Sequence, residues 1–79
     1  MTLKEYLKEN KIILNGDQRF LLGKKIAIIW DSQKRGNKNY IQEDGHRVND
    51  YTISFLKHKS INRNIIRFLT NLEKEVDNG

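Results

Sequence analysis

Residues 33–49 read QKRGNKNYIQEDGHRVN. The dipeptide Asp44-Gly45 in this stretch is typical of a two-residue type I′ turn, because such a turn needs a positive φ at both central positions. We therefore predict an antiparallel β-hairpin centred on these two residues. Its cross-strand pairs would be Glu43–His46, Gln42–Arg47, Ile41–Val48 and Tyr40–Asn49.

The alternation of the two strands gives the predicted hairpin two different faces. Ile41 and Val48 share one face, which can pack against a core. The opposite face carries cations, amides and an aromatic ring, on Lys38, Tyr40, Gln42, Arg47 and Asn49. A polyanion is the partner that such a face favours.

The composition of the chain limits its class. It has 79 residues and no cysteine, so we expect one small domain (residues 1–79) without disulfides, located in the cytoplasm, or in that of the host cell if the protein is viral. Two histidines without cysteine make a poor metal site, and we expect neither a metal nor a cofactor. The sequence contains no run of 18 apolar residues, so no membrane partner is expected.

The net charge of +5 is concentrated in one part of the chain. Residues 34–67 hold eight Lys or Arg against three Asp or Glu, whereas residues 68–79 hold one against three. Basic residues therefore gather in the predicted hairpin and in the helix expected after it, which is typical of a nucleic-acid-binding surface.

Two capping boxes mark the starts of two helices. Thr2 and Glu5 have the spacing at which each side chain bonds the backbone amide of the other, which predicts a short helix ending near Asn10. Asn15 and Gln18 repeat this spacing and predict a second helix start.

Residues 17–33 have two interpretations. Residues 26–30 are rich in strand-forming side chains, which would suit a strand. As a helix, the stretch places an apolar stripe on one side, formed by Leu22, Ile26, Ile29 and Trp30. We favour the helix, in which Trp30 is a core residue.

The secondary structure after the hairpin has two interpretations in its first segment and one in its last. Asn49-Asp50 could cap a short helix through Lys57, or residues 51–55 could form a strand, because apolar and polar side chains alternate there. A final helix capped by Ser60 is well defined. Its apolar stripe is formed by Ile61, Ile65, Phe68, Leu69, Leu72 and Val76, and Arg63, Arg67 and Lys74 lie opposite.

Together these elements predict an α+β fold: a compact helical domain with a β-hairpin and a closing C-terminal helix. The alternative is a three-stranded antiparallel sheet packed by that helix. The element order resembles small winged-helix DNA-binding modules of phage and viral regulatory proteins. The residues that carry the resemblance are Gln18-Arg19, Leu22-Gly23-Lys24-Lys25, Asp44-Gly45 and Val48-Asn49-Asp50-Tyr51. The resemblance covers about residues 17–70 and implies a recognition helix followed by a hairpin wing.

Candidate nucleic-acid-binding residues follow from this charge pattern. Gly36 lets the backbone of the basic loop approach phosphates, Asn37 has the carboxamide that matches adenine, and Tyr40 can stack on a base. The full set is Lys24, Lys34, Arg35, Asn37, Lys38, Tyr40, Arg47, Lys57, Lys59 and Arg63.

The sequence therefore predicts a small basic module that binds DNA rather than RNA, as a regulator or accessory factor of a phage or mobile element. A half-site of this size binds weakly alone, so we expect a homodimer, with Ile66 as a contact. The alternative is a protein-interaction module that inhibits a host or defence enzyme. We do not expect an enzyme, because the turn uses Asp44 and a thin hairpin leaves its neighbour Glu43 open to water.

Overall fold

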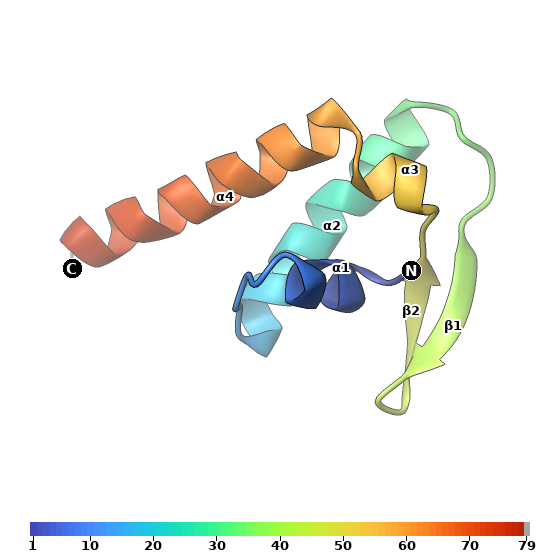
Figure 1. Ribbon diagram of the computed structural model, residues 1–79, viewed down its shortest axis with the longest axis horizontal. Coiled ribbons are helices and arrows are strands. Elements are labelled where there is room, and N and C mark those ends of the chain that lie inside the picture. Colours follow the sequence, from blue (N-terminus) through green and yellow to red (C-terminus); the bar gives the residue numbers. More distant parts are fainter. Residues whose placement is uncertain (79) are drawn as a thin grey trace.

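The computed structural model describes the backbone of residues 1–78 and the side chains of residues 1–74. The elements, in chain order, are α1 (Leu3–Glu9), α2 (Gly16–Ser32), β1 (Asn39–Glu43), β2 (His46–Asp50), α3 (Ile53–Leu56) and α4 (Lys59–Asn78). The hairpin and α4 extend from opposite sides of the helical body (Figure 1). The expected α+β class is confirmed.

The hairpin forms with the predicted register. All four expected cross-strand pairs are present, and a fifth joins Asn39 to Asp50. Asp44 and Gly45 have φ angles of 53° and 79°, both positive as the tight turn requires. Within the described residues the sheet has two strands, so the alternative three-stranded sheet is wrong.

Both predicted capping boxes are confirmed. Asn15 accepts a hydrogen bond from the Gln18 amide at 2.8 Å, and the Gln18 side chain accepts one from the Asn15 amide at 3.0 Å. The strand alternative for residues 26–30 is wrong, since they lie inside α2. Leu22, Ile26 and Trp30 recur every fourth residue and are buried, so α2 packs one continuous apolar stripe of its own surface against the core.

The short helix predicted through Lys57 forms, but its predicted cap at Asn49-Asp50 is wrong. Asn49 and Asp50 remain in β2, because their backbones continue the ladder opposite Tyr40 and Asn39. The chain turns into α3 two residues later, where the Thr52 hydroxyl accepts from the Phe55 amide at 3.3 Å. The strand alternative for residues 51–55 is therefore wrong as well.

The start of α4 uses a histidine in place of the expected serine. Ser60 already lies in the helix, and its amide donates to Nδ1 of His58 at 3.2 Å. Ile61 and Ile65 of the predicted stripe are buried, and Phe68 and Leu69 pack against the core. The predicted stripe residue Val76 lies outside the described side chains.

Three aromatic rings form a cluster in the core, one each from α2, the residue after β2, and α3. The Trp30 ring lies 5.5 Å from Tyr51 and 4.9 Å from Phe55, and Tyr51 and Phe55 are 5.1 Å apart between ring centroids. Trp30 also donates from Nε1 to the Gly36 carbonyl at 2.9 Å. The core role predicted for Trp30 is confirmed, and this cluster joins the end of α2, the basic loop, the end of β2 and α3.

Thr2 connects α1 to the hairpin. Its side chain is buried, and its hydroxyl accepts from the Glu5 amide at 3.2 Å while donating to the Glu43 carboxylate at 2.6 Å. One hydroxyl thus completes the cap of α1 and holds the end of β1 against it.

Removing this hydroxyl should destabilise the protein. We expect Thr2→Ala to lower the free energy of unfolding by about 1–2 kcal/mol relative to Thr2→Ser, since the two variants differ only in the capping oxygen. Urea unfolding followed by far-ultraviolet circular dichroism measures the difference. Equal stability of the two variants would contradict the assigned role.

Candidate functional site

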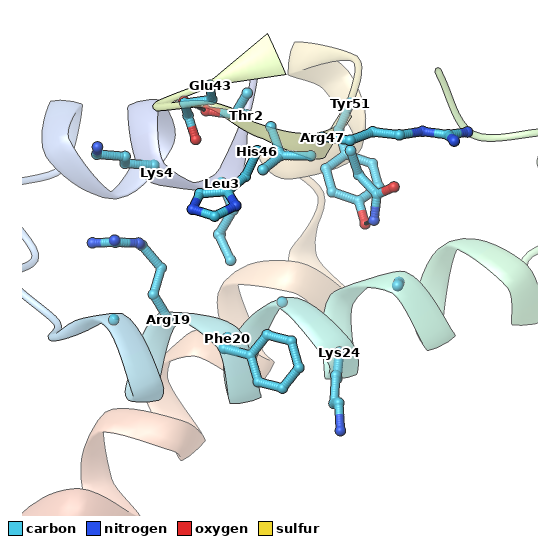
Figure 2. A pocket seen from close by; sticks show the side chains of 15 residues that line it. Thr2, Leu3, Lys4, Arg19, Phe20, Lys24, Glu43, His46, Arg47 and Tyr51 are labelled. Carbon is cyan, nitrogen blue, oxygen red and sulfur yellow. Dashed lines mark hydrogen bonds between the residues drawn. The ribbon is translucent and has the colours of Figure 1, made fainter. Parts of the chain in front are cut away.

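A groove lies between the start of α1, the inner side of α2 and strand β2. Its volume is about 710 Å³. Figure 2 shows α2 along one side and the hairpin along the other. Leu3, Gly23, Ala27 and Val48 contribute apolar surface to its wall. Small residues at 23 and 27 keep α2 thin on this side, which leaves the space open.

Cationic side chains from three elements surround the groove. They are Lys4 of α1, Arg19 and Lys24 of α2, and Arg47 of β2, and the imidazole of His46 lies among them. Arg19 points from α2 toward His46 and Lys4, whereas the Lys24 side chain leaves α2 on the side away from the hairpin and Arg47 extends from the hairpin at the opposite end from Arg19 (Figure 2). The side of the molecule that holds this groove is therefore positively charged.

Most of these charges are available to a ligand. Lys4 forms an ion pair with Asp44 in the hairpin turn. Arg19, Lys24 and Arg47 form no ion pair with any other residue whose side chain the structure describes. The groove also holds one carboxylate, Glu43, which is engaged by Thr2.

Two exposed aromatic rings hold cations near the groove. The Lys24 ammonium lies 4.8 Å from the centroid of Phe20, whose side chain is 64% exposed. On the hairpin, the Arg47 guanidinium lies 4.0 Å from the Tyr40 centroid. Such cation–π contacts restrict the positions of both cations without neutralising them.

The residues that the sequence predicted to bind nucleic acid lie in separate parts of the molecule. Lys24 and Arg47 line the groove, and Tyr40 contacts Arg47 beside it. Lys57 and Lys59 line a second, smaller hollow of about 400 Å³, which includes Glu9. Arg63 is exposed on α4. The predicted set is therefore not one continuous site.

The basic loop before the hairpin has mainly internal contacts. Lys38 donates to Asp31 at 2.7 Å, and this hydrogen bond raises the pKa of the Lys38 ammonium above its ordinary 10.5. The Arg35 guanidinium lies 4.9 Å from the Phe55 ring and covers the aromatic core. Lys34 and Asn37 are exposed, but no residue of this loop lines the groove.

Sequence reasoning missed four residues of the groove: Lys4, Arg19, Phe20 and His46. A signal for two of them was present, because Arg19 and Phe20 lie on the same side of α2 as Gly16, Gly23 and Ala27. Small residues at helical spacing next to a cation indicate an open helix face. Lys4 and His46 had no such signal, since they join the site through tertiary packing.

Comparisons with protein-family models, with curated proteins and with solved structures gave no match. No helix within residues 1–78 is long and apolar enough to cross a membrane.

The Lys4–Asp44 pair predicts a pH effect. The hydrogen bond and charge of Lys4 hold the pKa of Asp44 below its ordinary 3.8, so this contact stabilises the fold above that pH and is lost as the pH falls through the lowered pKa. We expect Lys4→Met to raise the Asp44 pKa toward 3.8, as measured by carboxyl ¹³C NMR titration. The matched variant Lys8→Met should leave it unchanged, and a pKa that does not respond to Lys4→Met would contradict the assignment.

Proposed function

We propose that this protein is a nucleic-acid-binding module whose groove holds a phosphodiester backbone, with duplex DNA as the target. One observation carries the proposal: Arg19, Lys24 and Arg47 line one groove, free of ion pairs with other described side chains. Arginine suits this role because its planar donors match two phosphate oxygens at once.

The shapes on either side of the groove favour a duplex. A helix about 10–12 Å across, such as α2, fits the major groove of B-DNA, which is about 12 Å wide. A backbone held between α2 and the hairpin places these two elements in the neighbouring grooves of the duplex. DNA is favoured over RNA because the major groove of A-form RNA is too narrow and deep for such a helix.

A module of this kind acts by occupying a site or by recruiting other proteins to it. We therefore propose the role of a regulator or accessory factor, of the kind that phages and mobile elements encode. Ile66 is 55% exposed on α4 and is open to contact with a second copy, which would join two half-sites.

A protein-interaction module is the second candidate. Leu21 and Ile28 are 52% and 66% exposed on α2 and do not line the groove. Exposed apolar side chains of this kind can meet a protein partner, including the host or defence enzyme considered above. Such binding would depend little on salt, which separates it from the first candidate.

The proposed function is tested by fluorescence anisotropy with a 24-base-pair duplex of random sequence at several salt concentrations. We expect micromolar binding that weakens steeply with salt. The triple variant Arg19→Ala/Lys24→Ala/Arg47→Ala should weaken binding at least tenfold and lower the salt slope by about three, one unit for each lost phosphate contact.

A charge-matched control removes three other exposed cations. Lys8→Ala/Arg67→Ala/Lys74→Ala has the same net charge as the groove variant, but its changes lie on α1 and α4, outside the groove. It should retain most of the affinity. Equal losses in both triple variants would show that binding depends on net charge and not on the groove. No binding at low salt would overturn the proposal.

A further inference from the structure

We infer that Phe20 reads thymine, by packing its ring against the 5-methyl group in the major groove. This inference rests on the proposed function and adds a base preference to it. The contact would be made by the part of α2 that borders the groove.

Phe20 combines exposure with a place in the groove. Its side chain is 64% exposed and lines the basic groove, whereas Leu21 and Ile28, the other exposed large apolar residues of α2, do not line it. Phe20 lies between Arg19 and Lys24 on the helix (Figure 2). Exposure of a full aromatic ring is unfavourable in water, so a ligand that covers this ring gains affinity from it.

The surrounding charges indicate the chemistry of that ligand. The Lys24 ammonium, at 4.8 Å from the ring centroid, occupies one side of the ring. Arg19 precedes Phe20 and points into the groove. A ligand that places an apolar group against the rest of the ring would lie beside both cations, so negative charge on that ligand would favour its binding.

DNA offers such a group at one base only. When a phosphodiester backbone lies in the groove, the adjacent outer surface of α2 faces the base edges that border this backbone. In the major groove, cytosine, guanine and adenine present polar edges, and only thymine presents a methyl group. Phenylalanine has no hydrogen-bonding atom, so the thymine methyl is the contact that it can make favourably.

Ile28 provides a matched control on the same helix. Its side chain is 66% exposed, close to the exposure of Phe20, but it does not line the groove. A general loss of apolar surface from α2 would affect both positions alike. A base contact would depend on Phe20 alone.

The experiment compares two duplexes that differ only in the methyl group. Binding of the wild-type protein, Phe20→Ala and Ile28→Ala is measured by anisotropy on a 24-base-pair alternating A·T duplex and on the same duplex with deoxyuridine in place of thymidine. We expect the wild type to prefer the thymidine duplex about fourfold for each methyl group covered. Ile28→Ala should keep this preference and Phe20→Ala should lose it. Circular dichroism confirms that both variants are folded.

The remaining outcomes separate this inference from the proposed function. Equal, salt-dependent binding of both duplexes by the wild type would overturn the inference and leave DNA binding in place. A thymidine preference that survives Phe20→Ala would overturn the role of Phe20. No binding of either duplex at low salt would overturn the proposed function, and the inference with it.

Discussion

Tyr51 fixes the hairpin to the helices, and the groove depends on this attachment. Its amide donates to the Met1 carbonyl at 2.8 Å, and its ring packs against Trp30 and Phe55. Burial raises the pKa of its phenol, whose oxygen accepts a hydrogen bond from Asn49 at 3.0 Å. A two-stranded hairpin is only marginally stable alone, so its position relative to α2 comes from this anchor and from Thr2.

The anchor decides which charges come together. Arg19 and Arg47 are 28 positions apart in the sequence and line the same groove because Thr2, at the start of α1, holds the hairpin where it faces α2. The loop cations Arg35 and Lys38 lie nearer to the hairpin in sequence, but their partners are Phe55 and Asp31. Proximity in sequence is therefore a poor guide to which cations share a surface in this small domain.

The elements that sequence reasoning found are those whose determinants are local. Thr2, Asn15 and Asp44-Gly45 each specify a cap or turn through contacts within a few residues, and all formed as predicted. The caps at Asn49-Asp50 and Ser60 were wrong because the strand ladder keeps residues 49 and 50 extended, and because α4 begins before Ser60, with the His58 ring accepting from the Ser60 amide. The groove could not be predicted, since its walls meet only through long-range packing.

The hydrogen bond from Trp30 to the Gly36 carbonyl has a practical consequence. Trp30 is the only tryptophan of the chain, and its indole is 92% shielded from solvent at the junction of α2, the loop and β2. Its fluorescence is therefore an intrinsic reporter for the docking of the hairpin. Emission would shift to longer wavelength when the hairpin separates from the helices, and it would do so without any attached dye.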